Sequence, residues 1–187
     1  MQLPGNTILK FAKLKTYTYV VQSPMGQLLM AADGEALTGL WFESQKYFPE
    51  SFGADDEEGT LLPVFEETIQ WLDLYFKGQQ PHFTPKLNLK GTPFRQRIWE
   101  MLLEIPYGEV VTYQYLAHRY AQEQGLKQMS AQAVGGAVGH NPVSIIVPCH
   151  RVVGTNGSLT GYAGGLDKKA TLLALEGCII PSTVKTQ

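Results

Sequence analysis

The order in which β-type and helical segments follow one another limits the folds open to this chain of 187 residues. Three short runs of aliphatic, aromatic and β-branched residues, 17–21, 27–32 and 37–42, come first. The turn signals Ser23-Pro24-Met25-Gly26 and Asp33-Gly34-Glu35 separate these runs. Short strands joined by tight turns pair in the antiparallel sense, so we expect a three-stranded meander.

A helix is expected after the meander. Its apolar residues recur at helical spacing: Leu62, Phe65, Ile69, Leu72 and Phe76. Gly78 supplies a stop signal, and we expect this helix to cover the apolar face of the meander. Three other segments are predicted to be irregular: a loose arm over 1–16, a solvated acidic loop over 53–59 and an extended linker over 79–91.

The second half of the chain is mainly helical in pattern. We expect helices over 93–105, 113–124 and 131–138. Each begins after a residue that favours the N-cap position: Thr92, Thr112 and Ser130. Because only a short break joins the second helix to the third, the pair suggests a helix-turn-helix.

The third of these helices has unusually small side chains. Gly135, Gly136 and Ala137 follow one another there. The backbone of such a helix can approach a partner more closely than long side chains would allow. Tight packing against a neighbouring helix is the alternative interpretation.

Composition places the chain among soluble globular proteins, because 44% of its residues are hydrophobic and 17% are charged. The N-terminus has neither an apolar stretch that could span a membrane nor the residue order of a signal peptide. With only two cysteines, Cys149 and Cys178, the chain suits a reducing compartment: the cytoplasm, or the nucleus if the source has one. The histidines are scattered rather than clustered at zinc-ligand spacing, so we expect no metal.

The charge is unevenly distributed, although the net charge is only -2. Residues 1–89 carry 6 Lys and Arg against 11 Asp and Glu, whereas residues 90–187 carry 9 against 6. Binding to phosphates requires a local basic face rather than a basic protein. The asymmetry is therefore compatible with DNA binding by the second half.

Cys149 follows a proline between two apolar, β-like runs, 144–147 and 152–153. Pro148 restricts its own backbone and that of the residue before it, so the cysteine follows a rigid, buried approach. A buried free cysteine is usually a structural residue. Here the adjacent His150 and Arg151 can take the thiol proton or stabilise the thiolate, which is the nucleophilic form. We therefore interpret Cys149 as a nucleophile.

Three further residues each have a local and a functional interpretation. Asn141 precedes a proline, where its side chain can bond to a turn. Tyr162 lies among glycines, either as a surface residue or as a lid that stacks on a flat ligand. Glu176 lies in the last turn of the final expected helix, where a carboxylate opposes the helix dipole. It is either solvated at small cost or paired with a buried partner, for which His150 is the natural candidate.

Several motifs of the second half occur together in one known family. They are Gly91-Thr92-Pro93-Phe94, the run Ile105 to Tyr113, Asn141-Pro142-Val143, Pro148-Cys149-His150-Arg151-Val152-Val153 and Gly161-Tyr162-Ala163-Gly164-Gly165-Leu166. In these motifs the chain resembles the O6-alkylguanine-DNA alkyltransferases, which are methylated-DNA–protein-cysteine methyltransferases. The resemblance covers residues 91–177 almost continuously, whereas the first half fits only in the order of its strands and helix.

The resemblance implies an α+β fold of two domains. Residues 1–88 would form a supporting domain, RNase H-like, with the three-stranded antiparallel sheet and its helix. Residues 89–187 would form a helical domain, winged helix-turn-helix-like, that carries the DNA-binding surface and the active site.

The activity that the resemblance implies is DNA repair by direct reversal, without a cofactor and by a monomer. The Cys149 thiolate would attack the alkyl carbon on O6-alkylguanine, and on O4-alkylthymine as well, and would keep the alkyl group permanently. His150 would be the base acting through water, and Glu176 would orient it. Asn141 would fix the turn between the DNA-binding helix and the active site.

The resemblance also implies contacts with the substrate and with the minor groove of double-stranded DNA. The residues at those positions are Tyr113, Gln132, Gly135, Ala137, Arg151, Tyr162 and Ala163. Tyr113 would help to rotate the nucleotide out of the duplex, and the loop at Tyr162 would form a wall of the base pocket. Gln132 departs from the family, because an arginine commonly fills the gap that the flipped base leaves. Glutamine lacks the charged guanidinium, so we expect flipping to be weakened or handled differently.

Two other functions are alternatives to alkyl transfer. The first is a non-catalytic relative that only binds alkylguanine DNA. Such relatives have another residue, typically tryptophan, in place of the cysteine, and Gln132 is the one feature of this sequence that supports this alternative. A Cys–His hydrolase requires an oxyanion hole, and nothing in the sequence singles one out. The presence of Cys149 favours the transfer reaction over both.

Overall fold

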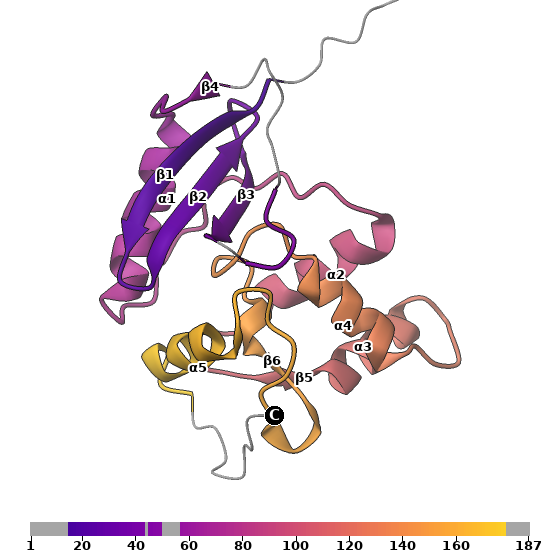
Figure 1. Cartoon of the computed structure of the whole chain (residues 1–187). Coiled ribbons are helices and arrows are strands. Elements are labelled where there is room, and N and C mark those ends of the chain that lie inside the picture. The colour runs from indigo at the N-terminus through magenta and orange to yellow at the C-terminus, as the bar shows by residue number, and fades with distance from the viewer. Residues whose placement is uncertain (1–14, 44, 50–56, 179–187) are drawn as a thin grey trace, which may run out of the picture.

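The computed structural model describes residues 15–43, 45–49 and 57–178 (Figure 1). Its strands are β1 (Tyr17–Ser23), β2 (Gly26–Ala32), β3 (Leu37–Phe42), β4 (Glu57–Glu58), β5 (Val111–Thr112) and β6 (Val152–Val153). Its α-helices are α1 (Pro63–Phe76), α2 (Pro93–Leu103), α3 (Tyr113–Glu123), α4 (Ala131–Gly139) and α5 (Leu166–Leu175). Two 3₁₀ turns within these ranges are η1 (Cys149–Arg151) and η2 (Thr155–Gly157).

The first half is built on a mixed sheet in the order β3-β2-β1-β4. The predicted meander is confirmed, because β2 pairs antiparallel with both β1 and β3. The prediction of three strands was one too few, since β4 pairs parallel with β1 through Glu57 and Glu58. These residues come from the segment that was predicted to be a solvated loop. An edge strand such as β1 offers unpaired backbone groups that even two residues can satisfy.

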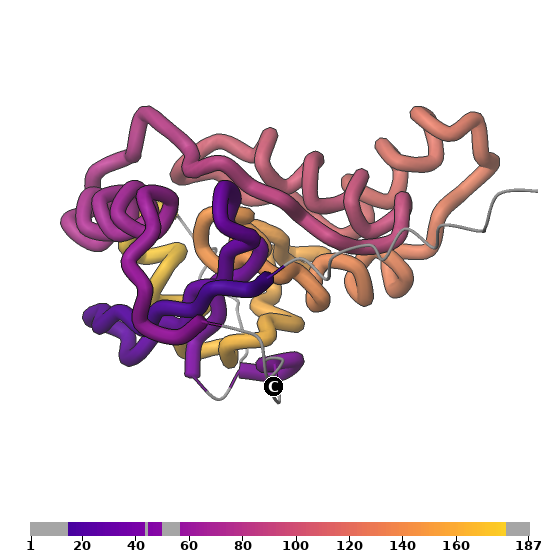
Figure 2. Tube along the Cα trace, turned by 90° about the horizontal axis from the view of Figure 1, so that it is seen from above, coloured from indigo at the N-terminus to yellow at the C-terminus, as the bar shows by residue number. Residues whose placement is uncertain are grey.

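The arm predicted over 1–16 and the acidic loop predicted over 53–59 lie mostly outside the described residues. Helix α1 was predicted correctly and lies along one face of the sheet (Figures 1 and 2). Phe65 and Tyr75 are fully buried on its inner face, and the Phe65 ring lies 6.0 Å from that of Tyr19 in β1. This helix therefore closes the apolar face of the sheet.

Helices α2, α3 and α4 begin at the three predicted N-caps. The Thr92 hydroxyl accepts a hydrogen bond from Arg95 N (3.3 Å), and that of Thr112 accepts one from Tyr115 N (3.0 Å). The Ser130 hydroxyl accepts one from the third residue of α4 (3.4 Å). Each bond satisfies a backbone donor that the first helical turn leaves unpaired. None of the helices in the described ranges has the length and apolarity needed to cross a bilayer.

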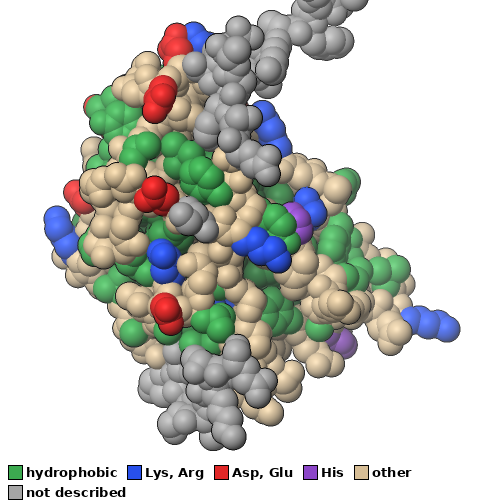
Figure 3. Space-filling model, viewed as in Figure 1, with side chains coloured by type: hydrophobic (Ala, Val, Ile, Leu, Met, Phe, Trp, Pro, Cys, Tyr) green, Lys and Arg blue, Asp and Glu red, His purple; other side chains and the backbone are tan. Residues whose placement is uncertain are grey.

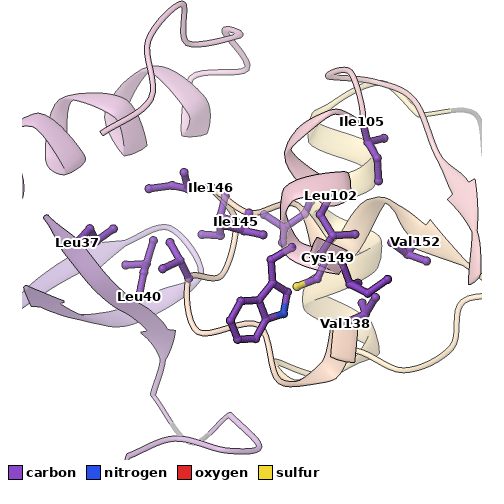
Figure 4. Packing of buried hydrophobic residues seen from close by; sticks show 14 of the residues in the cluster. Leu37, Leu40, Leu102, Ile105, Val138, Ile145, Ile146, Cys149 and Val152 are labelled. Atoms are coloured by element: carbon purple, nitrogen blue, oxygen red, sulfur yellow. The ribbon is translucent and has the colours of Figure 1, made fainter. Parts of the chain in front are cut away.

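The two halves share one hydrophobic core. At their junction, Leu40 N of β3 donates to Pro142 O (2.9 Å), and Ser144 N donates to Leu40 O (2.8 Å). Ile145 and Ile146 then fill the space between the sheet and Cys149 (Figure 4). Because of this shared core, the first half positions the segment that leads into Cys149.

The apolar run 144–147 was predicted to be β-like, and this prediction was wrong. The chain turns there: Val147 N donates to Val143 O (3.1 Å), and Ile145 has a φ of 70°. A left-handed conformation is rare for a β-branched residue and is tolerated here because the side chain is fully buried among its neighbours. Cys149 follows this turn and begins the 3₁₀ turn η1.

Candidate active site

Cys149 is buried at the start of η1, directly after the turn that Asn141 holds. Asn141 Nδ2 donates to Val147 O (2.8 Å) and lies 3.1 Å from Cys149 Sγ, while Asn141 Oδ1 accepts from Val143 N (3.0 Å). Burial raises the pKa of the Cys149 thiol, whereas the Asn141 hydrogen bond and the charge of Lys169 act to lower it. Asn141 thus fixes the backbone and also stabilises negative charge on sulfur.

His150 and Glu176 meet in the interior, as the sequence suggested. His150 Nε2 lies 2.6 Å from Glu176 Oε1, and neither side chain has solvent-exposed area. Glu176 follows the last residue of α5 and therefore opposes the helix dipole, but it also accepts from Gly108 N (3.1 Å). Tyr75 of α1 donates to Glu176 Oε1 (2.7 Å) as well. The carboxylate is therefore paired rather than solvated.

The protonation of the pair leaves His150 able to act as a base. Burial raises the pKa of Glu176, but hydrogen bonds from His150 and Arg151 outweigh it and bring the pKa to about 2. Burial lowers the pKa of His150, so the imidazole is neutral near pH 7. Because Glu176 is an ionised acceptor, His150 Nε2 carries the proton and Nδ1 keeps a lone pair. That Nδ1 is buried and has no hydrogen-bond partner among the residues described.

Arg151 was predicted to contact substrate or DNA, and its placement corrects that prediction. Its guanidinium is turned inward: Nε and Nη2 bind the Glu176 carboxylate at 2.7 and 3.1 Å, and Nη1 donates to Ile105 O (2.6 Å). It also lies 5.6 Å from the centre of the Tyr107 ring. A planar guanidinium can bind a carboxylate through two parallel bonds, which explains why the arginine is retained inside rather than on the surface.

Lys169 was missed by the sequence reasoning, although its position in α5 carries a signal. It is fully buried, and its ammonium donates to Val152 O (2.5 Å) and Thr160 O (2.7 Å). Burial lowers the pKa of Lys169 to about 8. Three and four residues later come Leu172 and Leu173, so helical spacing alone places Lys169 on the apolar face of α5. Tyr75 carries the same kind of signal, because it follows Trp71 and Leu72 by four and three residues on the buried face of α1.

Ala137 was predicted to contact DNA but is 3% exposed, on the face of α4 that packs against α2. Its carbonyl accepts from Trp99 Nε1 (2.9 Å). The helical period places Val134 and Ala137 inside, and Gln132 and Gly136 outside. A side chain added at Gly136 would meet nothing within 4 Å, so helix packing does not explain that glycine.

Three of the remaining predicted residues line a hollow of about 380 Å³. They are Tyr113, Gln132 and Gly135, and Thr160 and Gly161 line the same hollow. Tyr113 Oη bonds to Thr160 O (2.9 Å), and burial raises the pKa of Tyr113 to about 12. The hollow therefore brings together residues from α3, α4 and the loop before α5.

Tyr162 and Ala163 line a second hollow, and Gly161 lines both hollows. The Tyr162 hydroxyl is buried and lacks a hydrogen-bond partner in the described part of the chain. Burial raises the pKa of Tyr162, and the nearby Cys149 raises it further. Tyr162 is thus a pocket residue rather than a surface lid.

On the face drawn in Figure 3, acidic and basic side chains are mixed over the sheet and α5, whereas only basic and histidine side chains are visible over α2, α3 and α4. On this face, the uneven charge seen in the sequence is therefore uneven in space as well. Within the ranges that the structure describes, no three His, Cys, Asp or Glu side chains are grouped so that they could hold a metal ion.

Two family models match the chain. Residues 15–89 match the ribonuclease-like domain of 6-O-methylguanine DNA methyltransferase, and residues 93–178 match its DNA binding domain. The methylated-DNA–protein-cysteine methyltransferase of Mycobacterium leprae is 46% identical over 83% of this chain and 89% of its own length. That of Haemophilus influenzae is 44% identical over 86% and 85%.

The fold agrees with solved structures. The crystal structure of Mycobacterium tuberculosis O6-methylguanine methyltransferase has a TM-score of 0.73 at 41% identity, over 86% of this chain and 92% of that one. The crystal structure of Mycobacterium tuberculosis OGT in complex with DNA has a TM-score of 0.71 at 40% identity, with the same coverage. The chain therefore belongs to the 6-O-methylguanine DNA methyltransferase family.

Proposed function

We propose that this protein repairs DNA by transferring the alkyl group of O6-alkylguanine, and of O4-alkylthymine, to Cys149. The observation that carries the proposal is the buried array in which Glu176 holds His150 (2.6 Å) next to a cysteine that Asn141 contacts (3.1 Å). Family membership supports the same reaction, because the relatives are named as methylated-DNA–protein-cysteine methyltransferases.

The chemistry follows from the protonation of the array. A water molecule passes the Cys149 proton to His150 Nδ1, whose lone pair is free because Glu176 holds the proton of Nε2. The thiolate then attacks the alkyl carbon; the C–S bond forms as the C–O6 bond breaks, and the electron pair leaves on guanine. Guanine regains a proton at N1, ultimately the one the thiol lost. The thioether is stable, so each molecule reacts once.

DNA delivery is assigned to the exposed face of α4. Gly135 and Gly136 let the α4 backbone approach the minor groove, and Tyr113 and Gln132 border the hollow next to them. The lesion must leave the base stack to reach a buried sulfur. Gln132 is long enough to enter the gap but lacks the guanidinium, so flipping depends more on Tyr113. We infer that one monomer acts on one lesion, and that residues 1–88 form the supporting domain and 89–187 the reactive one.

A hydrolase is disfavoured by the backbone at the nucleophile. The amide of a nucleophilic cysteine is a common oxyanion donor, but Cys149 N already donates to Val147 O (2.8 Å). The free cysteines also favour a reducing compartment, namely the cytoplasm or a nucleus.

The proposal is tested by mass spectrometry of the intact protein after incubation with a duplex that contains O6-methylguanine. We expect a gain of one methyl group on Cys149 and no turnover. Cys149→Ala should abolish the gain, whereas Cys178→Ala, the matched control, should retain it. Binding without a mass change would point to a non-catalytic relative, and multiple turnover to a hydrolase; either result contradicts the proposal.

A further inference from the structure

The second hollow lies where the two halves of the chain meet. It has a volume of about 360 Å³. Glycines of α4 line one side, and Tyr162 and Ala163 line another. Lys46 and Tyr47, from the segment that follows β3, line the third side. The first two sides belong to the DNA-facing helix and the base pocket of the proposed function, whereas the third comes from the half that was expected only to support them.

The Lys46–Tyr47 segment is attached to both of the other sides. Lys46 N donates to Ala163 O (2.9 Å), which ties the segment to the pocket loop. The Tyr47 ring stacks on that of His140 at the end of α4, with centroids 4.1 Å apart and planes inclined by 24°. His140 is held in turn, because its Nδ1 donates to Gly136 O (2.7 Å). The position of Tyr47 is therefore set by α4.

The conformation of Tyr47 is unusual for an exposed aromatic residue. Its φ is 64°, a region that bulky side chains seldom adopt, and 50% of its surface is exposed. Gln45, two residues before it, anchors the segment from the interior, since the side-chain oxygen Gln45 Oε1 accepts from Phe42 N (2.9 Å) and Ser144 Oγ (3.1 Å). A large apolar ring is thus kept at the rim of the hollow by its surroundings, as is common at functional sites.

The rim also has the charge that a phosphate requires. The Lys46 ammonium lies 5.0 Å from the centre of the Tyr47 ring, and Lys46 is exposed. Among the described residues that line the hollow, none is acidic. Exposed lysine pairs with phosphate as a point charge, and exposed aromatic rings pack on sugars and bases.

We propose that Lys46 and Tyr47 are a DNA contact supplied by the N-terminal half. Lys46 binds a phosphate of the strand that carries the flipped-out nucleotide, and the stacked rings of Tyr47 and His140 pack against that strand at the mouth of the base pocket. The inference rests on the proposed function, because it requires α4 to face the DNA. It gives the N-terminal half a role in holding substrate beyond its support of the core.

Single-turnover methyl transfer from an O6-methylguanine duplex tests this contact. The quantity measured is the duplex concentration that gives half the maximal rate, at 50, 100 and 200 mM salt. Loss of one phosphate contact lowers the slope of log affinity against log salt by about 0.9. Between 50 and 200 mM salt, the factor by which affinity falls should therefore be ~3-fold smaller for Lys46→Gln than for the wild type. Lys77→Gln, at the far end of α1 (Figure 1), makes the same change of charge and should keep the wild-type slope. Tyr47→Ala should raise the half-saturating concentration about fivefold or more, and Tyr47→Phe should not.

Free O6-benzylguanine separates this inference from the proposed function. All four variants should react with it at the wild-type rate, since it has no phosphate or strand to hold. An unchanged salt slope for Lys46→Gln would overturn the contact, as would equal slowing of Tyr47→Ala on the free base and on the duplex. In both cases transfer by the wild type would still stand. If the wild type transferred no alkyl group from either substrate, the proposed function itself would fail.

Discussion

Glu176→Gln tests how much folding free energy the buried carboxylate provides. In the folded protein this carboxylate accepts from His150 Nε2 (2.6 Å), Tyr75 Oη (2.7 Å) and Arg151 Nε (2.7 Å). Against the opposing effect of burial, His150 and Arg151 lower the pKa of Glu176 from 4.5 to about 2. Since one pKa unit corresponds to ~1.4 kcal/mol, the ionised carboxylate contributes about 3 kcal/mol.

The sign of the pH dependence follows from that lowered pKa. Between pH 4.5 and 2 the unfolded chain binds the proton and the folded chain does not, so the contribution is complete above pH 4.5 and is lost as the pH falls toward 2. Glu176→Gln lacks this component and also leaves the Arg151 guanidinium without its carboxylate. We expect the variant to be less stable at pH 7 by roughly 3–5 kcal/mol. This difference should shrink by about 2 kcal/mol between pH 5 and pH 2.5.

Urea unfolding followed by tryptophan fluorescence, at pH 7 and in steps from pH 5 to 2.5, measures both quantities. Glu104→Gln is the matched control, because Glu104 pairs with Arg119 at the surface and has a side chain that is 45% exposed. Such a pair contributes at most about 1 kcal/mol. A difference between Glu176→Gln and the wild type that stayed constant from pH 5 to 2.5 would refute the assignment of an ionised, hydrogen-bonded carboxylate.

Two further substitutions test the delivery of the base and the activation of the thiol. Gln132→Arg should speed transfer from duplex DNA severalfold and leave the rate with free O6-benzylguanine unchanged, as measured by single-turnover kinetics; an equal change on both substrates would contradict a role in flipping. Lys169→Met removes the buried charge that lowers the pKa of Cys149. With free O6-benzylguanine, the pH–rate profile of this variant should shift to higher pH. Its rate at pH 7 should fall on the order of tenfold, because raising the thiol pKa by one unit lowers the thiolate fraction about tenfold. An unshifted profile would show that Lys169 has only a structural role.

Local sequence predicted the elements of this fold because the forces that begin and end them are local. The hydroxyls of Thr92, Thr112 and Ser130 bond to amides three residues away, so each N-cap can be read from a few neighbouring residues. The spacing of apolar residues likewise predicted α1, and the tight turn between the first two short strands predicted the antiparallel pairing of β1 and β2. The short strand β4 escaped prediction, because its two acidic residues have no β propensity and pair only because β1 leaves an edge open.

Part of the candidate active site was also predicted, because some of its residues are close together in the sequence. Cys149 and His150 are adjacent in the chain, and the unfavourable place of Glu176 at a helix end indicated a buried partner. The direction of Arg151 could not be predicted, because it depends on whether the Glu176 carboxylate and the Ile105 carbonyl lie within reach.

By itself, then, the sequence predicted the nucleophile, and it determined the helix that carries the small residues and the order of the elements. Tertiary structure alone decided what surrounds them. Tyr75 reaches Glu176 across 101 residues, and Tyr47 stacks on His140 from the other half of the chain. Such contacts arise when a shared core brings distant segments together, and no local propensity records which side chains will then face one another.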